Sequence, residues 1–376
     1  MPARCRAAGA VATLLALALS ACTSTARPAP VRVEPSVSPG RTPDQRAAAV
    51  RELAQPNIDA GVLPGIVVAL RDGNDLRVIA LGQARTRPAS PMLPGTRFPI
   101  ASITKSMTAT LVMQLVEENR LSLDDTVASV LPGLLRHGRS ITVRNLLSHR
   151  SGLREPQLFF DSHLPERGVV RAIADAALVD PPDSVTNYRN VNFVILALIV
   201  ERLRGQPLAT TLRQHVFGPA GMVAAALPRG STATRGVAHG YDVDTEVPPL
   251  VVGDGWDGAG GVVASAGGVV ASAADVDAFF HALFTHRLLG VRFVDAMVRP
   301  RPGTAVFGWA GYGLGLARRS TGCGEAVGHE GLVLGYSTAA WTMPRTGRSV
   351  VVLANSSARS AGGTFSAVLD IALCDR

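Results

Sequence analysis

The segment IASITKSMTAT, residues 100–110, contains the only lysine in a chain with 37 basic residues. Lys105 follows Ser102 by three positions, so both side chains share one face if the segment is helical. An arginine stays protonated at useful pH, whereas a buried lysine can lose its proton and act as a base. A serine beside such a base can become a nucleophile. The pair therefore predicts acyl transfer through Ser102, although biased composition could also leave one lysine, and Ser-x-x-Lys alone is a common pattern.

Two further segments carry side chains that suit the same chemistry. Tyr188 and Asn190 lie in NYRN, directly before an apolar stretch. A phenol near an ammonium can have its pKa lowered and carry protons, and Asn190 could bind Lys105 or a substrate amide. His329 lies in GHEG, where the glycines permit close approach of a ligand, and it could supply a donor or a positive charge. Taken alone, each segment also has a purely structural explanation.

The elements around these residues predict one sheet built from both ends of the chain. Apolar runs at 65–82 and 336–357 each flank a turn-forming stretch, which indicates β-hairpins. A helix is expected from Thr42 and Pro43 onward, and another over about 360–373. The middle of the chain shows helical or helix-plus-turn patterns at 106–121, 141–153, 169–178, 190–205 and 208–222. We therefore expect a helical lobe inserted into an α/β lobe, with the ligand site in the cleft between them.

Taken in order, Ser-x-x-Lys, Tyr-x-Asn and His-x-Gly resemble the penicillin-recognising serine hydrolases. The branch most similar joins class C beta-lactamases, exported D-alanyl-D-alanine carboxypeptidases and related esterases. The resemblance covers about 43–376 and includes ITVRNLLSHRSGL, YGLGL and GHEGLVLGYS. It implies the α/β (α+β) fold of this family, an antiparallel sheet flanked by N- and C-terminal helices. The α/β lobe would comprise about 43–107 and 262–376, and the all-helical lobe about 108–261.

The resemblance also implies a role for each candidate catalytic residue. Ser102 would attack a carbonyl and become acylated. Lys105 and Tyr188 would together take its proton, and Tyr188 would return one to the leaving group. Asn190 would orient the substrate and Lys105, and His329 would stand where many relatives carry a lysine. His149, outside this set, is expected to brace the helical lobe.

The implied oxyanion site departs from the pattern of the relatives. The backbone N–H groups of Ser102 and Leu332 would bind the oxyanion, with Gly331 between Leu332 and Glu330. At the positions of Glu330 and Leu332, relatives usually carry hydroxyl side chains, which help to hold a free carboxylate of the substrate. Glu330 would instead repel a carboxylate, unless Arg318 or Arg319 compensates. We therefore expect weak recognition of D-alanyl peptides, or a preference for esters or neutral amides.

The sequence leaves four candidate functions, which we rank by how well its residues support them. The first is a D-alanyl-D-alanine carboxypeptidase-like hydrolase that forms an acyl-enzyme at Ser102 on cell-wall peptides. The alternative is an esterase or a hydrolase of other D-amino-acid peptides, which Glu330 and Leu332 favour. A class C-type beta-lactamase ranks third, because it needs fast deacylation. A surface lipoprotein that only binds a ligand ranks last, because it has no need of Lys105 and Tyr188. The substrate would be a small peptide, an ester or a beta-lactam.

The first 42 residues predict export rather than a folded element. A basic start is followed by an apolar stretch at 7–20, which is shorter than the roughly 20 residues needed to span a bilayer. The stretch ends in LSAC, which resembles a lipobox, so 1–21 would be a lipoprotein signal peptide and Cys22 the lipidated residue. Residues 22–42 would form a Pro/Ser/Thr-rich tether. The mature protein would be anchored on the outer face of the bacterial membrane, with ordinary secretion as the alternative.

Cysteine use and charge narrow the remaining possibilities. Cys323 and Cys374 can pair in an oxidising compartment, and two free buried thiols are the alternative. The formal net charge is +8, but the arginines are scattered without interleaved aromatics, so nucleic acid is not expected as a partner. No cofactor is expected, because no His/Cys/Asp cluster has metal-ligand spacing and GAGGVVASAGG lacks the end of a phosphate loop. The oligomeric state is not predicted.

Overall fold

The structure is a computed structural model that describes residues 40–156, 166–228, 236–242, 250–252, 264–303, 307–333, 335–357 and 361–374. Residues 40–376 form one compact unit. The expected signal peptide, Cys22 and nearly all of the expected tether lie outside the described residues. So does the expected lobe boundary at 261/262, which falls within 253–263.

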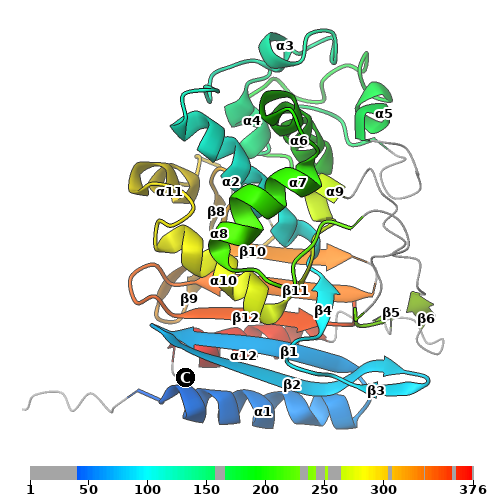
Figure 1. Cartoon of the computed structure of the whole chain (residues 1–376), viewed down its shortest axis with the longest axis vertical. Helices are drawn as coiled ribbons and strands as arrows, with labels where there is room; N and C mark the ends of the chain where they lie inside the picture. Colours follow the sequence, from blue (N-terminus) through cyan, green and yellow to red (C-terminus); the bar gives the residue numbers. More distant parts are fainter. Residues whose placement is uncertain are drawn as a thin grey trace, which may run out of the picture. The chain divides into compact units, whose positions relative to one another are not determined.

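The first helix, α1 (Pro43–Asp59), begins as its sequence predicts. The Thr42 side chain accepts a hydrogen bond from the backbone N–H of Gln45, and the Gln45 side chain accepts one from the N–H of Thr42. This capping box satisfies backbone donors that a helix start leaves unpaired. The last helix, α12 (Ala361–Cys374), packs beside α1 on the same face of the sheet (Figure 1).

The central sheet is antiparallel and joins the two ends of the chain. Its strand order is β3-β2-β1-β12-β11-β10-β9-β8. The strands are β1 (Gly65–Asp72), β2 (Asp75–Thr86), β3 (Ala89–Pro91), β8 (Gly311–Tyr312), β9 (Ala317–Thr321), β10 (Gly324–Val333), β11 (Tyr336–Thr342) and β12 (Ser349–Ala354). β1 pairs with β12 in the register Ile66↔Ala354, so both expected hairpins meet in mid-sheet. Every residue of β12 is buried, as its unbroken apolar run requires.

Helices cover the other face of the sheet and extend away from it (Figure 1). They are η1 (Ala101–Ile103), α2 (Thr104–Glu117), α3 (Val127–Val130), α4 (Val143–Leu147), α5 (Glu166–Arg171), α6 (Asn190–Arg204), α7 (Leu208–Leu212), η3 (Arg213–Phe217), α8 (Gly218–Ala220), α9 (Ala264–Gly267), α10 (Ala273–Phe284) and α11 (Val291–Val298). α6 is buried on all sides from Val191 to Val200 and packs on α2, α4 and α5. The segment 169–178 is helix plus turn, the second of the two expected forms, because α5 ends at Arg171 and turns follow.

Two small sheets complete the fold. β4 (Arg97–Pro99) pairs with β7 (Val270–Ser272), and β5 (Gly240–Asp242) pairs with β6 (Leu250–Val252). The β4–β7 pair leads the chain directly into η1, where Ser102 lies. The sulfur atoms of Cys323, in the β9–β10 turn, and Cys374, at the end of α12, lie 2.02 Å apart as a disulfide. The bond joins the last helix to the turn between β9 and β10.

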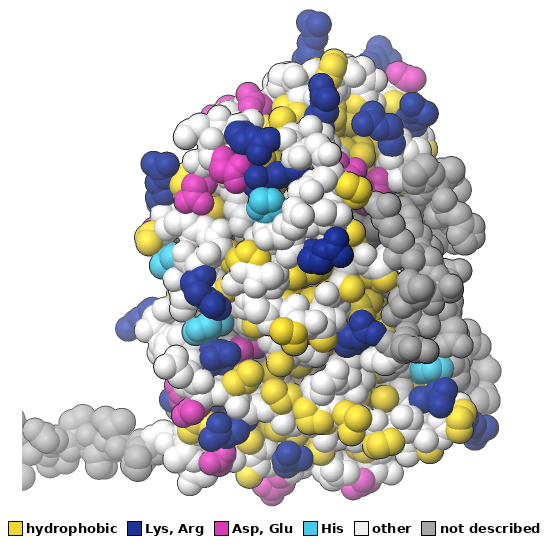
Figure 2. Space-filling view, in the orientation of Figure 1, with side chains coloured by type: hydrophobic (Ala, Val, Ile, Leu, Met, Phe, Trp, Pro, Cys, Tyr) yellow, Lys and Arg dark blue, Asp and Glu magenta, His cyan; other side chains and the backbone are white. Residues whose placement is uncertain are grey.

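On the face drawn in Figure 2, the Arg side chains of the described residues are dispersed among acidic and uncharged ones. Within the described part of the chain, no helix has both the length and the apolar character needed to cross a membrane.

Candidate active site

The nucleophile candidate lies at a sharp bend before α2. Ala101 has a φ of +48°, a conformation that costs a residue with a Cβ of order 1–3 kcal/mol. A hydrogen bond holds the bend in place. The Ile100 N–H donates to the carbonyl oxygen of Val269, the residue before β7, at 2.9 Å. Ser102 is half-buried. The strained turn therefore presents the Ser102 hydroxyl beside the first turn of α2.

Lys105 lies one turn further on and is completely buried. Its Nζ lies 2.8 Å from Ser102 Oγ and 2.7 Å from the carbonyl oxygen of Ala266 in α9. Burial lowers the pKa of Lys105 to about 7, although the charge of Glu155 opposes this change. A substantial share of the amine is therefore neutral near pH 7, and the neutral amine can accept the proton of Ser102. The predicted contact between the two side chains is present in the structure.

Tyr188 approaches the same serine from the residues that lead into α6. Its hydroxyl hydrogen-bonds to Ser102, and its ring centroid lies 5.0 Å from Lys105 Nζ. Burial raises the pKa of Tyr188 above its usual value, and the negative charge of Glu155 adds to this change. The expected lowering of this pKa by the nearby ammonium is therefore wrong, because desolvation outweighs it. Tyr188 stays protonated and can donate a proton, which leaves Lys105 as the base.

His149 supports Tyr188 from behind. Its ring centroid lies 4.2 Å from that of Tyr188, and Nδ1 lies 3.2 Å from both the Arg189 N–H and Asn192 Nδ2. Because a backbone N–H can only donate, Nδ1 must be the acceptor and Nε2 carries the proton of the neutral ring. Burial holds the pKa of His149 well below its usual value. His149 thus braces the start of α6 in the helical lobe, as expected, and carries no charge there.

Asn190 begins α6, but its side chain does not make the hydrogen bond to Lys105 that was one of its two expected roles. The hydrogen bonds of Lys105 Nζ go to Ser102 and Ala266, and no bond among the described residues joins it to the side chain of Asn190. The backbone N–H of Asn190 donates instead to Glu155 Oε2 at 2.7 Å. The half-buried Asn190 side chain remains a candidate contact for a substrate amide.

Glu155 is a site residue that the sequence did not reveal. One of its oxygens caps α6, while Oε1 is buried without a hydrogen-bond partner among the described residues. Its negative charge acts to raise the pKa of both Lys105 and Tyr188. Burial raises the pKa of Glu155. No neighbouring pattern marks this position, because a lone acidic residue in a loop is ordinarily a solvated charge.

The β10 strand passes close to the nucleophile because of one glycine. A Cβ placed on Gly331 would lie 2.6 Å from the carbonyl oxygen of Ile100 and 2.9 Å from Ala101 Cβ. Thr338 on β11 holds the two segments together, since its hydroxyl donates to the carbonyl of Ile100 at 3.0 Å. The backbone that runs from Gly331 into Leu332 therefore lies beside η1. This placement suits the expected oxyanion donors, the N–H groups of Ser102 and Leu332.

His329 does not bring the positive charge that the sequence suggested. It is fully buried, and burial lowers its pKa to about 3, with the charge of Lys105 acting in the same direction. Nδ1 lies 2.5 Å from the carbonyl of Glu330, so it carries the proton, and Nε2 accepts from the Tyr312 hydroxyl at 3.2 Å. His329 is thus uncharged and lies beside the site, with its ring centroid 6.3 Å from that of Tyr188.

Glu330 is paired rather than free. Its carboxylate accepts from Arg319 at 3.0 Å and from the indole N–H of Trp309 at 3.1 Å. Arg318 pairs with Glu325. Of the two arginines that could offset Glu330, Arg319 is the one that does so. The net charge of the Glu330–Arg319 pair is therefore close to zero, and the Arg319 guanidinium is already bound to a carboxylate.

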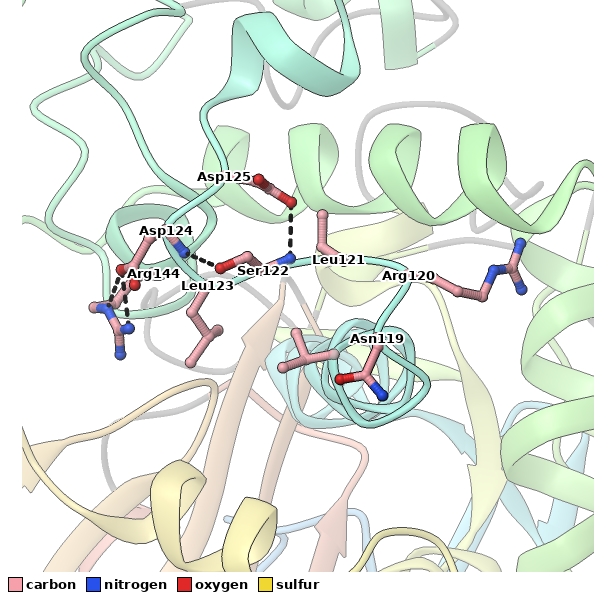
Figure 3. Close-up of a pocket in the computed structure, with 9 residues that line it drawn as sticks. Asn119, Arg120, Leu121, Ser122, Leu123, Asp124, Asp125 and Arg144 are labelled. Carbon is pink, nitrogen blue, oxygen red and sulfur yellow. Dashed lines mark hydrogen bonds and ion pairs between the residues drawn. The ribbon is translucent and has the colours of Figure 1, made fainter.

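A pocket elsewhere offers no comparable chemistry. It encloses about 520 Å³ around residues 119–125 and Arg144, at the end of α2 opposite to Ser102 (Figure 3). Its charged groups are already bonded, since Arg144 binds Asp124 at 2.9 Å and the Asp125 carboxylate accepts from the Ser122 N–H at 2.7 Å. Among the described residues, no group of three or more His, Cys, Asp or Glu side chains could hold a metal ion. The active-site candidate is therefore the cluster around Ser102.

Comparison with known proteins agrees with the geometry. The family model described as Beta-lactamase matches residues 49–373. Penicillin-binding protein 4 of Amycolatopsis lactamdurans is 33% identical over 201 residues, which cover 51% of this chain and 52% of that protein. A D-aminopeptidase of Brucella anthropi is 30% identical over 295 residues, which cover 74% of this chain and 53% of that protein. The chain thus spans about half the length of these relatives.

A solved structure extends the likeness to nearly a whole protein. The D-stereospecific amidohydrolase from Streptomyces sp. has a TM-score of 0.75 and 26% sequence identity, with 87% of this chain and 99% of that chain covered. The similarity confirms the expected fold class, a large antiparallel sheet with helices in the beta-lactamase arrangement.

Proposed function

Because the chain belongs to the beta-lactamase family of serine hydrolases, we propose that it hydrolyses small amides and peptides whose amino-terminal D-residue has a free α-amino group. Two similar proteins are a D-aminopeptidase and a D-stereospecific amidohydrolase, which supports the choice of a D-residue. The chain spans only about half of the D-aminopeptidase, so the substrate assignment rests on this chain's own site.

The observation that carries the proposal is the buried oxygen of Glu155. Oε1 has no partner among the described residues and belongs to a carboxylate whose charge reaches Lys105 and Tyr188. A buried polar atom without a partner is costly. The ammonium group of a substrate would give Oε1 both a hydrogen bond and an opposite charge. Arg189 also acts on Glu155, but no hydrogen bond among the described residues joins the two side chains.

The reaction follows from the proton positions at the site. Neutral Lys105 takes the proton of Ser102, whose Oγ attacks the substrate carbonyl. The oxyanion lies at the N–H groups of Ser102 and Leu332. Tyr188 gives its proton to the leaving amine and regains one from protonated Lys105, which completes the acyl-enzyme. Water then releases the acid product, with the proton transfers reversed.

The carboxypeptidase and the beta-lactamase both rank below this function. Substrates of either enzyme bring a free carboxylate to the site, where the Glu155 carboxylate would repel it and the Glu330–Arg319 pair offers no net positive charge. Arg319 is occupied by Glu330. An esterase remains the nearest rival, because the same Ser102, Lys105 and Tyr188 would cleave an ester without any contact to Glu155.

The test compares D-alanine p-nitroanilide with its N-acetyl form, using wild-type protein and Glu155→Gln. The leaving group and the D-alanyl core are then the same, and acetylation replaces the ammonium by a neutral amide. We expect wild type to prefer the free amine by about 10-fold or more in kcat/KM, and Glu155→Gln to lose that preference. The N-acetyl substrate serves as the control for any effect of Glu155 on Lys105. Preference for the N-acetyl form, or release of D-alanine from an N-acylated D-alanyl-D-alanine, would instead support the carboxypeptidase.

We further propose that the protein is exported and anchored through a lipid on Cys22, or secreted if Cys22 is not modified. The bond between Cys323 and Cys374 supports this proposal, because disulfides persist in oxidising compartments. Labelling with a radioactive fatty acid tests it. Label on the wild-type protein that is absent from Cys22→Ala would support the anchor, and export without label would leave plain secretion.

A further inference from the structure

Three aromatic rings cluster at the catalytic candidate Tyr188: Tyr188 itself, the buried Trp309 and the exposed Phe307. Phe307 is 70% exposed, although its side chain is large and apolar. Its ring centroid lies 5.3 Å from that of Tyr188 and 5.6 Å from that of Trp309, and both pairs meet edge to face. Aromatic pairs favour this arrangement. We call Tyr188, Phe307 and Trp309 the aromatic shelf.

Trp309 is held in place by the residue that departs from the family pattern. Its indole N–H donates to Glu330 Oε2 at 3.1 Å, and Arg319 holds the other oxygen of Glu330. The Trp309 ring also stacks on Tyr312 with centroids 5.7 Å apart and meets His329 edge to face at 5.1 Å. Glu330 thus acts on the shelf through Trp309, which gives this carboxylate a structural reason to be present.

The shelf lies on the leaving-group side of the site. The Tyr188 hydroxyl hydrogen-bonds to Ser102, so a leaving atom that receives the proton of Tyr188 must lie near that hydroxyl. A substituent on the leaving atom can then extend along the Tyr188 ring toward Phe307. Among the described residues, Phe307 and Leu332, at 70% and 69%, are two of the three most exposed large apolar side chains, and both adjoin catalytic candidates. Apolar surface concentrated at a site indicates an apolar ligand.

We propose that the aromatic shelf binds a flat apolar or aromatic leaving group, and that Glu330 is a positioning residue that fixes Trp309 for this contact. The proposal rests on an acyl-enzyme at Ser102, but it does not require the free amine in the substrate. It deepens the proposed function by naming the second half of the substrate, such as an aryl amine or an aromatic residue after the D-residue.

The experiment measures selectivity for the leaving group with esters that share one acyl group, phenyl acetate and methyl acetate. Neither ester has an amine, so failure of the Glu155 test leaves this measurement intact. We expect Phe307→Ala to lower the phenyl-to-methyl ratio of kcat/KM by about 3- to 10-fold relative to wild type. The ratio cancels intrinsic reactivity and any partial misfolding. Leu93→Ala, which removes an apolar side chain with 58% exposure in another part of the chain, is the matched control.

Variants of Glu330 test its positioning role. Glu330→Gln keeps an oxygen acceptor for the Trp309 N–H, whereas Glu330→Leu removes it. We expect Glu330→Leu to lower the ratio as Phe307→Ala does and Glu330→Gln to retain most of the wild-type ratio. An unchanged ratio in Phe307→Ala would overturn the shelf. Equal loss in Glu330→Gln and Glu330→Leu would overturn the positioning role.

Discussion

Lys105 Nζ lies 2.8 Å from Ser102 Oγ and 2.7 Å from the carbonyl oxygen of Ala266. The carbonyl accepts one N–H of the amine and so directs its remaining hydrogen-bonding positions toward the serine. Because no carboxylate binds Nζ directly among the described residues, burial controls its protonation, and the pKa of Lys105 falls to about 7. In the proposed reaction, Tyr188 delivers a proton and the other groups of the site keep this arrangement in place.

Replacing Tyr188 by Phe separates its two roles. The ring and its contact with His149 remain, while the hydroxyl that returns a proton is lost. An amide leaving group needs that proton, whereas p-nitrophenolate leaves without it. We expect Tyr188→Phe to lower kcat/KM for D-alaninamide by about 10²- to 10⁴-fold and to affect a p-nitrophenyl ester much less. Equal losses on the two substrates would show that Tyr188 does not serve the leaving group.

Substituting Gly331 tests the close approach of β10 to the nucleophile. The Cβ in Gly331→Ala would lie 2.4 Å from Thr338 Oγ1 and 2.6 Å from the carbonyl oxygen of Ile100. Either β10 or the bend before η1 must therefore move. A displacement of about 1 Å can cost roughly 10²-fold in rate. We expect a loss of this size in acylation by a p-nitrophenyl ester. Gly95→Ala, whose Cβ meets nothing within 4 Å, is the control. Full activity in Gly331→Ala would mean that β10 does not form the oxyanion site.

Burying Lys105 should also cost stability in a pH-dependent way. The pKa of Lys105 is about 7 in the folded protein and near 10.5 when the group is exposed. Between these values the unfolded chain binds more protons, so the free energy of unfolding of the wild type rises with pH. The Lys105→Met variant has no ionisable group at this position, so its free energy of unfolding lacks this pH-dependent contribution. We expect the variant to be more stable than the wild type below pH 7, and its advantage to shrink toward pH 10, in guanidinium unfolding. A difference that does not vary with pH would contradict the lowered pKa.

The disulfide between Cys323 and Cys374 should stabilise the fold without serving the reaction. It spans a sequence separation of 51 residues, and closing such a loop contributes about 4 kcal/mol in the chain-entropy model. We expect the double variant Cys323→Ser, Cys374→Ser to unfold at lower denaturant concentration and to keep its kcat/KM. Titration of free thiols in the unfolded wild type should find none from this pair. Two reactive thiols would show that the bond does not form.

The sequence was sufficient for features that depend on local spacing or on apolar pattern. Ser102 and Lys105 meet because they are three positions apart at a helix start, and the two hairpins pair because both are apolar runs around turns. The sheet that joins β1 to β12 followed from the same pattern, with the family resemblance as support.

Features that depend on burial could not be predicted in this way. The pKa of Tyr188 was expected from a neighbouring ammonium, and a positive charge on His329 was expected from its place in the motif. Desolvation decides both, and desolvation requires a structure. Glu155 gave no local signal. The partner of Glu330, Trp309, lies 21 positions away in the sequence, and only the packing of β10 brings the two together.

The most direct test of the central claim, that neutral Lys105 is the base for Ser102, is the pH dependence of kcat/KM for a neutral ester such as p-nitrophenyl acetate. This profile reports groups of the free enzyme. Activity should rise with pH to a plateau, with its half-maximal value near the Lys105 pKa of about 7. Lys105→Arg should lack this step and retain only residual activity. A wild-type profile that is flat from acidic to alkaline pH, or half-maximal near the ordinary lysine value of 10.5, would contradict the account.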